Sequence, residues 1–207
     1  MTLSAIEINS LKHAPAVEGV LPVIHERWSS RAFADRDVSP INLARVFEAA
    51  RWAASSNNEQ PWRFIVGVRN SETHKKMAAC LMGFNQAWAA IAPVLILGVA
   101  STKFSHNGSS NSYAQFDLGA ASSYLTLQAA ALGMTTHQMA GFNHDALREA
   151  LGIPESYALG TLIALGYQGE PGALSNEQLI AREVAPRTRK PMKEMVFTSW
   201  EEPADLA

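Results

Sequence analysis

The sequence has a single cysteine, Cys80, among its 207 residues. One thiol can form neither an intramolecular disulfide nor a thiolate metal cluster, so a reducing compartment is favoured. Charged residues make up only 17% of the chain, below the roughly one quarter that is typical of globular domains. The net charge of -2 comes without the basic stripe that nucleic-acid binding requires. The shortage of charge favours an oligomer in which an apolar interface covers part of the surface.

Long hydrophobic runs are also missing. The longest apolar run, residues 87–100, is shorter than the roughly 20 residues of a membrane span and is divided by Pro93. The N-terminus lacks a charged start followed by an apolar core, so no signal peptide is expected. We therefore predict a cytoplasmic protein with no membrane partner. The apolar run itself predicts the end of a helix followed by a buried strand.

Several familiar site motifs are absent. The sequence contains no GxGxxG after a predicted strand, no P-loop and no GxSxG elbow. His106 has no other histidine, cysteine or carboxylate at coordinating spacing, so no metal site is predicted. The serines and histidines form no triad, and no catalytic side chain is assigned. These absences disfavour Rossmann, P-loop and α/β-hydrolase chemistry.

A block of neutral hydrogen-bonding side chains, AASSNNEQPW, occupies residues 53–62. Apolar residues at helical spacing precede it and β-branched residues follow it, which predicts a helix-to-strand connection. Uncharged polar groups suit a ligand rich in heteroatoms. A plain turn would have the same composition, so both interpretations stay open at this point.

A second unusual run is RWSSRAF at residues 27–33. At helical spacing Arg27 and Arg31 would share one face, and two guanidiniums could bind a phosphate and the polar edge of a ring. The alternative is a solvated helical turn in which Ser29 or Ser30 is a cap.

The two runs belong to an ordered set of motifs that resembles the nitroreductase family of FMN-dependent oxidoreductases. The set continues with APVLILGVA, DLGAASSYLTLQAAALGM, THQMAGF, LIALGY and PRTRKPMKEMV, and it covers nearly the whole chain after about residue 20. The resemblance implies an α+β fold in which helices flank a central sheet, within an intertwined homodimer. It divides the chain into an N-terminal arm or short helix (residues 1–22), an FMN-binding domain (23–198) and a C-terminal tail (199–207).

The resemblance also implies an FMN site. Arg27, Arg187 and Arg189 would hold the phosphate, Arg31 would face flavin N1 and O2, and Gly141 would present its N–H to N5. The full set of implied cofactor-binding residues is Arg27, Trp28, Ser29, Arg31, Ser55, Ser56, Asn58, Asn85, Gln138, Met139, Ala140, Gly141, Arg187 and Arg189, of which Ser55, Ser56 and Asn58 would come from the partner subunit. Many relatives carry a glutamate where this chain has Ala140.

The substrate pocket is expected at the loop of residues 101–115, whose length and composition are typical of a functional loop. We expect it to be lined by Phe104, His106, Asn107, Tyr113 and Phe142. A disordered surface loop is the alternative. His137 could be a catalytic acid, although a core or ring-packing histidine is the favoured interpretation.

The implied activity is ping-pong transfer of hydride from NAD(P)H through FMN to nitroaromatic, quinone or similar flat electron-poor acceptors. The alternatives are another FMN reaction, such as dehalogenation, dehydrogenation or flavin fragmentation, and a non-enzymatic flavin-binding protein. The partner would be a second copy of the chain, paired through a helix at residues 116–132 that is rich in small residues. The other expected elements are helices at 70–84 (with Met77, Cys80, Leu81 and Phe84 buried) and 143–151, and strands at 94–99, 135–140 and 159–166.

Overall fold

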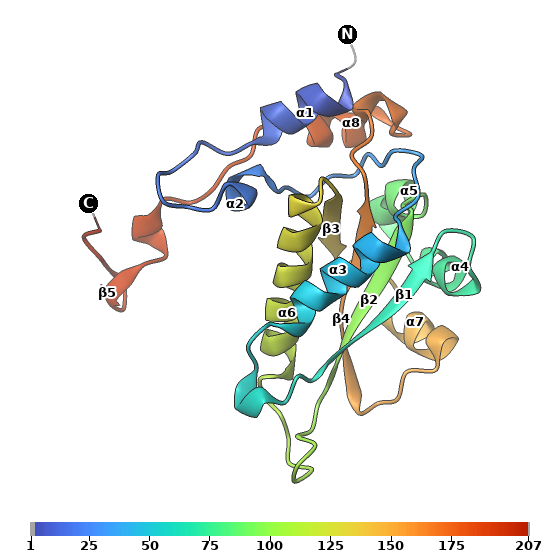
Figure 1. Ribbon diagram of the computed structural model, residues 1–207, viewed down its shortest axis with the longest axis vertical. Helices are drawn as coiled ribbons and strands as arrows, with labels where there is room; N and C mark the ends of the chain where they lie inside the picture. Colours follow the sequence, from blue (N-terminus) through green and yellow to red (C-terminus); the bar gives the residue numbers. More distant parts are fainter. Residues whose placement is uncertain (1–2, 207) are drawn as a thin grey trace.

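The structure is a computed structural model that describes residues 3–206. Its centre is a four-stranded sheet in the order β1-β2-β4-β3, and every neighbouring pair is antiparallel (Figure 1). The strands are β1 (Trp62–Val68), β2 (Val94–Ser101), β3 (Thr135–Met139) and β4 (Tyr157–Gly166). The predicted α+β class is therefore confirmed, and the strands fall within a few residues of their expected positions.

The central strand β2 is buried on both faces, which explains its uninterrupted apolar sequence. Because side chains alternate along a strand, Val94 and Ile96 join one hydrophobic cluster while Leu95 and Leu97 join another. The first cluster contains residues of α3 (Pro40–Arg51) and α6 (Ala114–Ala131), and the second contains residues of α4 (Glu72–Ala79), α5 (Gln86–Ala89), α7 (His144–Leu151) and α8 (Glu177–Val184). Helices thus cover both faces of the sheet.

Two glycines in neighbouring strands let α6 approach the sheet closely. A β-carbon at Gly160 would lie 2.5 Å from Leu118 Cδ2, and one at Gly98 would lie 3.1 Å from Leu118 Cδ1. Gly98 also lies where the pairing of β2 with β4 shifts between Leu97 and Val99. The absence of side chains at this irregularity makes room for Leu118, which anchors the N-terminal half of α6.

The expected helix at residues 70–84 is shorter than predicted. Helix α4 ends at Ala79, and the chain then turns so that Leu81 bridges Phe142. This pairing takes the backbone out of the helix. Phe84 is consequently 47% exposed, and its predicted burial is wrong, whereas the burial of Met77, Cys80 and Leu81 is confirmed.

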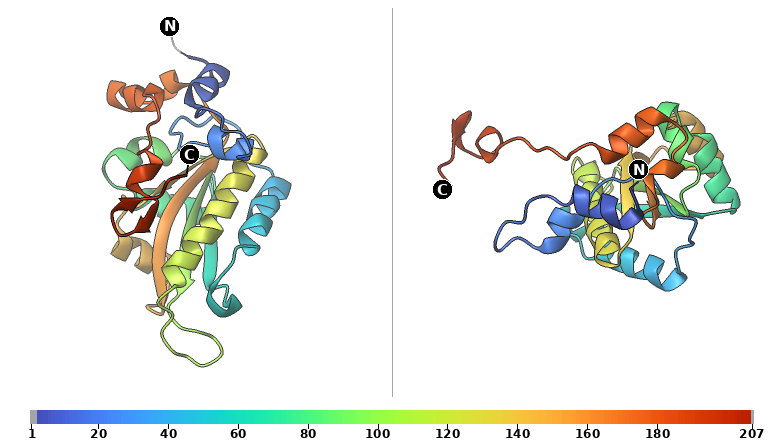
Figure 2. Two further views of the ribbon diagram at one scale, coloured as in Figure 1. Left: turned by 90° about the vertical axis from the view of Figure 1, so that its left-hand side faces the viewer. Right: turned by 90° about the horizontal axis from the view of Figure 1, so that it is seen from above.

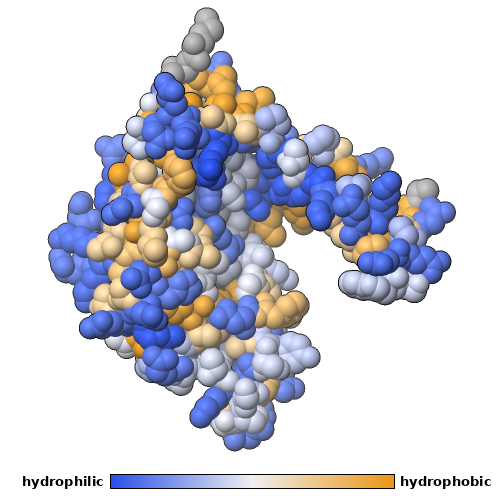
Figure 3. Space-filling view, turned by 180° about the vertical axis from the view of Figure 1, so that it is seen from behind, coloured by the Kyte–Doolittle hydropathy of each residue, from blue (hydrophilic) through white to orange (hydrophobic). Residues whose placement is uncertain are grey.

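Helix α1 (Ala5–Lys12), near the N-terminus, and helix α8, before the C-terminal arm, lie side by side (Figure 1). Helix α1 packs on α8, and α2 (Pro22–Glu26) leads into the Arg27 segment. Beyond α8 the chain forms an arm with a short helix (Met192–Glu194) and a hairpin of β5 (Phe197–Ser199) and β6 (Glu202–Pro203). The arm projects away from the domain in Figure 1 and in the right-hand view of Figure 2, and it leaves an open hollow beneath it (Figure 3). Within residues 3–206, no helix is long and apolar enough to cross a membrane.

Candidate functional site

The segment from Arg27 to Phe33 is extended, so the predicted helical face shared by Arg27 and Arg31 is wrong. Ser29 forms an isolated parallel bridge with Thr136 of β3, and Phe33 forms an antiparallel bridge with Gln168. The segment therefore runs alongside the sheet as an irregular extension of it. Tertiary pairing with the end of β3 outweighs the local helical tendency that the sequence pattern suggested.

Glu183 of α8 holds this segment in place. Its side chain is fully buried, and its carboxylate accepts hydrogen bonds from Arg31 N (2.9 Å), Ala32 N (3.0 Å) and Ser30 Oγ (2.8 Å). The Arg31 guanidinium adds an ion pair at 3.7 Å. A buried carboxylate is tolerated only when it is paired and hydrogen-bonded in this way. The sequence analysis missed Glu183, although its position four residues after buried Leu179 places a charge on the buried side of α8.

Three guanidiniums converge on a cavity of about 460 Å³ between α2, α6 and the start of the arm. Arg27, Arg187 and Arg189 line it together with Ser123, Thr126 and Gln138, and no carboxylate is among its lining residues. Arg187 and Arg189 therefore face the same cavity. A cavity with this charge is suited to a multivalent anion.

Of the three arginines, Arg27 is the one whose positive charge is least compensated by the protein. Its Nε is buried and has no hydrogen-bond partner, and its Nη2 lies 3.4 Å from Ser29 Oγ. Burial, followed by the charges of Arg187 and Arg189, lowers the pKa of Arg27. Arginine nevertheless stays charged in proteins, so the cavity keeps an unmatched cation that an anion would neutralise.

Arg187 has a structural role as well. Its Nη1 donates to the carbonyl oxygens of Lys12 (2.8 Å) and His25 (2.7 Å). These bonds tie the start of the C-terminal arm to the ends of α1 and α2. Arg189, in contrast, donates only to the carbonyl of its neighbour Thr188 among the described contacts, so most of its donors remain available.

Trp28 lies apart from the arginine cavity's lining. The indole is 7% exposed, donates from Nε1 to Asn9 Oδ1 at 3.0 Å, and lies under Lys12 Nζ at 4.9 Å from the ring centroid. Trp28 thus holds α1 against the domain. It lines a smaller cavity of about 260 Å³ that also includes Arg27.

Four of the predicted cofactor-binding residues lie at or just after the C-terminal end of β3, namely Gln138, Met139, Ala140 and Gly141. Gln138 lines the cavity and bonds Thr161 Oγ1 at 2.9 Å. Asn85 Nδ2 donates to the Gly141 carbonyl at 3.1 Å, and a β-carbon at Gly141 would lie 2.6 Å from that nitrogen. Met139 is buried and Ala140 is exposed. A glycine at 141 is therefore required for Asn85 to reach the backbone.

Phe142 does not lie with the other predicted pocket residues. It is 3% exposed and stacks on His144, with ring centroids 4.0 Å apart. The structure places it in the hydrophobic core, because the Leu81 bridge draws its backbone inward.

The other predicted pocket residues lie in the loop at the N-terminal end of α6, where Tyr113 is 59% exposed and the rings of Phe104 and His106 are 5.4 Å apart. Asn107 Oδ1 accepts from Ser109 N at 2.9 Å. Glu59, another residue that the sequence analysis missed, anchors this loop by accepting from Ser105 N at 2.9 Å and Ser105 Oγ at 3.1 Å. Its side chain is 8% exposed. The loop is thus attached to the segment of residues 53–62.

Ser55, Ser56 and Asn58 are remote from the arginine cavity of the same chain. Ser56 N donates to Asp117 Oδ2 at 3.1 Å near the start of α6, whereas the arginine cavity contacts Ser123, Thr126 and Leu127 further along the helix. Figure 1 shows the 55–58 turn and the arginine segment toward opposite ends of α6. Asp117 is six residues from Ser123 and nine from Thr126 along α6, which corresponds to a rise of about 9–14 Å at 1.5 Å per residue. A single chain therefore does not join these two sets.

His137 is a packed core histidine, in agreement with the favoured interpretation. Its ring tilts against Trp88 at a centroid distance of 4.6 Å, and Nδ1 lies 3.1 Å from the Ser30 carbonyl. Burial, and then the charge of Arg31, lower the pKa of His137 to about 4. The imidazole is therefore neutral at pH 7 and donates from Nδ1 to the carbonyl.

This lowered pKa predicts a pH dependence of stability. Below pH 6.5 the unfolded chain protonates His137 while the folded chain does not, so the free energy of unfolding should fall as the pH drops toward 4. The contribution of this residue is about 3 kcal/mol between pH 7 and pH 4. We expect urea unfolding of His137→Asn to depend less steeply on pH than that of the unmodified protein. Parallel curves would contradict the prediction.

Comparison with known proteins identifies the family of the chain. The chain matches the Nitroreductase family over residues 24–87 and 79–167. It is 34% identical over 156 residues to a protein of Archaeoglobus fulgidus provisionally named as an NADH dehydrogenase/NAD(P)H nitroreductase, covering 73% of this chain and 86% of the relative. It is 27% identical to an NADH dehydrogenase of Thermus thermophilus, covering 81% of this chain and 98% of that protein. A crystal structure described as an oxidoreductase containing FMN superposes with a TM-score of 0.82 and 32% identity, covering 89% of this chain and 94% of that one. The chain belongs to the nitroreductase family.

Proposed function

We propose that the protein is an FMN-dependent oxidoreductase that takes hydride from NAD(P)H and passes it to a flat electron-poor acceptor such as a nitroaromatic or a quinone. The observation that carries the proposal is the arginine cavity, in which Arg27, Arg187 and Arg189 face one another without a carboxylate. The FMN phosphate is a dianion that would offset two of these three positive charges. The relative described as containing FMN and the relative named as an NAD(P)H nitroreductase support the same assignment.

The residues present fit FMN. The buried Arg27 Nε lacks an acceptor, which a phosphate oxygen would supply. Gln138 and Thr126 offer neutral hydrogen-bonding groups beside the guanidiniums, as the polar edge of a flavin requires. Asn85 and Gly141 lie at the following turn. When bound, FMN would supply the chemistry of accepting and returning hydride at N5.

The chain's own contribution is position and charge. Glu183 fixes the backbone at Arg31 and Ala32, so the arginine segment is held before any ligand arrives. Arg31 is our candidate for the cation beside N1 and O2, where negative charge would develop. Its ion pair with Glu183 restrains the guanidinium and offsets part of its charge.

A turnover experiment separates this proposal from its alternatives. Purified protein reconstituted with FMN should lose its flavin absorbance when NADH or NADPH is added without oxygen, and menadione or a nitroaromatic should restore it. Steady turnover of the nicotinamide with the acceptor is the expected result. Bound flavin that neither nicotinamide bleaches would instead favour a different FMN reaction or a protein that only binds flavin.

We predict that Arg27→Met weakens FMN binding about ten- to hundredfold, because charge-assisted hydrogen bonds to phosphate are lost. The FMN-free variant should be at least as stable as the unmodified protein, since a buried unpaired cation is removed. Lys190→Met is the control, because it removes the same charge from an exposed position next to Arg189. Fluorescence titration measures the FMN dissociation constants of both variants. Equal dissociation constants for the two variants would refute a phosphate at Arg27.

We further propose a homodimer through the outer face of α6. This face carries apolar and small side chains at helical spacing, and Phe116 and Tyr124 are 76% and 46% exposed. An antiparallel two-fold pairing of α6 with its copy would bring the 55–58 turn of one subunit toward the arginine cavity of the other. Ser55, Ser56 and Asn58 would then complete the FMN site from the second subunit. The arm that projects from each chain is in keeping with an intertwined assembly.

This arrangement predicts that association and FMN binding fail together. Ala120→Arg places a bulky charge at a half-buried position of α6, one turn from exposed Phe116 and one turn from exposed Tyr124, and should yield a monomer that retains little FMN, because a ligand that binds only the dimer stabilises it. Light scattering measures association, and flavin absorbance measures the amount of FMN retained. Ala79→Arg, at an exposed position on α4, is the matched control and should leave both unchanged. A folded Ala120→Arg monomer that binds FMN with undiminished affinity would exclude the shared site.

A further inference from the structure

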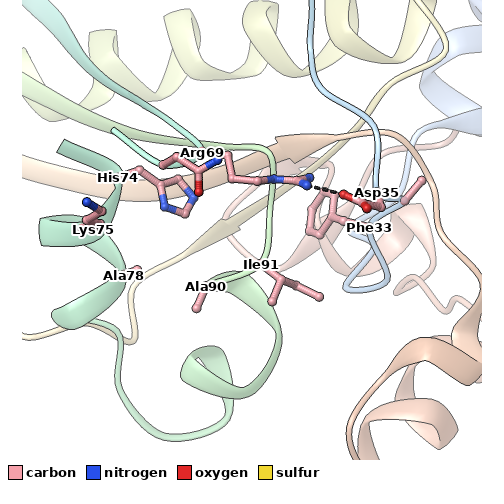
Figure 4. Close-up of a pocket in the computed structure, with 10 residues that line it drawn as sticks. Phe33, Asp35, Arg69, His74, Lys75, Ala78, Ala90 and Ile91 are labelled. Atoms are coloured by element: carbon pink, nitrogen blue, oxygen red, sulfur yellow. Dashed lines mark hydrogen bonds and ion pairs between the residues drawn. The ribbon is translucent and has the colours of Figure 1, made fainter. Parts of the chain in front are cut away.

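A second cavity of about 540 Å³ lies away from the arginine cavity and shares no lining residue with it. It is formed by the turn after β1, one side of α4, the residues just after α5 and the segment that begins at Phe33. Its size falls within the range of small-molecule sites. Figure 4 shows side chains of these four elements around one space.

One side of the cavity is apolar and fixed. The Phe33 ring is 6% exposed and stacks on Trp88 at a centroid distance of 6.3 Å. Ala78 and Ala90 add small apolar surfaces, and Ile91 is 56% exposed at the rim. This surface can bury a compact aliphatic group but has no depth for a long chain.

Arg69 provides the polar side. Its side chain extends across the cavity to Asp35, above Phe33 in Figure 4, and Nη1 forms an ion pair with that carboxylate. The buried Nε has no hydrogen-bond acceptor among residues 3–206, and a carboxylate oxygen of Asp37 is 4.0 Å away. The Arg69 backbone N donates to the Pro93 carbonyl at 2.8 Å, which fixes the base of the side chain. The guanidinium therefore has donors that the protein leaves unmatched.

Among the other polar groups around the cavity, His74 and Lys75 are bonded elsewhere, and Asp35 and Asp37 hold the guanidinium only weakly. His74 Nε2 lies 2.9 Å from the Ala92 carbonyl. Lys75, at the rim, forms an ion pair with exposed Glu72 and adds positive charge. The side chains of Asp35 and Asp37 are 94% and 80% exposed, so the attachment of Arg69 to them is worth little and exchanges readily.

We propose that this cavity binds a small monocarboxylic acid with a compact aliphatic body. The carboxylate would take two donors of the Arg69 fork, in place of Asp35, while the aliphatic group covers Ala78, Ala90 and Ile91. The ligand has an advantage over Asp35 because its aliphatic group also covers the apolar shelf, which is the surface formed by Ala78, Ala90 and Ile91. Because the Asp35 side chain is 94% exposed, it can move into solvent and leave the Arg69 guanidinium to the single carboxylate of the ligand.

The probe is cyclohexanecarboxylate, which is not flat and so does not suit a flavin-stacking site, and the reference is cyclohexanecarboxamide. Calorimetric titration of the FMN-loaded protein at pH 7 should show that the carboxylate binds about tenfold tighter than the amide. Arg69→Met should remove this preference. Arg45→Met, which removes an exposed arginine from α3, should preserve it.

Asp35→Asn gives the sharpest test. If Asp35 competes with the ligand for the Arg69 guanidinium, this variant should bind the carboxylate several-fold tighter. A purely structural ion pair predicts no gain in affinity. Ala78→Leu fills the apolar shelf and should weaken binding while Arg69 is intact. Circular dichroism and flavin content verify folding of each variant. Equal binding of acid and amide, unchanged acid binding in Arg69→Met, or no gain in Asp35→Asn would each overturn the proposal.

Discussion

The candidate site depends first on the buried carboxylate of Glu183. This side chain comes from α8, far along the chain, and accepts hydrogen bonds from the backbone of the Arg31 segment and from Ser30. Leaving these buried donors unpaired would cost about 1–3 kcal/mol each, so the segment has one favourable position. Because Ser29 and Arg27 precede this fixed point, their placement along β3 follows from it. The C-terminal third of the chain thereby determines the geometry of a segment near the N-terminus.

The Glu183 carboxylate also distinguishes Arg31 from the three arginines that line the arginine cavity. Arg31 has Glu183 as its counter-ion, whereas the arginine cavity has no carboxylate among its lining residues. Burial would normally disfavour three neighbouring guanidiniums, and the lowered pKa of Arg27 shows this cost. Such an arrangement is stable only if hydrogen bonds or a ligand compensate for it. Arg187 obtains its bonds from two backbone carbonyls, which leaves Arg27 as the group that most needs an anion.

Much of this organisation could be predicted from local sequence. The uninterrupted apolar run of β2 and the small residues of α6 identify a buried strand and a closely packed helix without further information. The extended course of residues 27–33 could not be predicted, because it depends on bridges to Thr136 and Gln168 more than 100 positions away. The early end of α4 has the same origin, since the Leu81 bridge to Phe142 is also a long-range contact. Local spacing cannot distinguish a helix from a segment that distant strands hold extended.

Arg187 connects the candidate anion site to the C-terminal arm. Its guanidinium lines the arginine cavity, yet its Nη1 is bonded to the carbonyls that end α1 and α2, and the arm departs within a few residues of it. An anion in the cavity would draw on the remaining donors of Arg187 and on Arg189. It would therefore also fix the point from which the arm leaves the domain and the direction that it takes. Exposed Trp200, near the tip of the arm, would be presented to a second copy from a more rigid base. In the proposed dimer, ligand binding and association would thus be coupled through one short segment, in addition to any contact across α6.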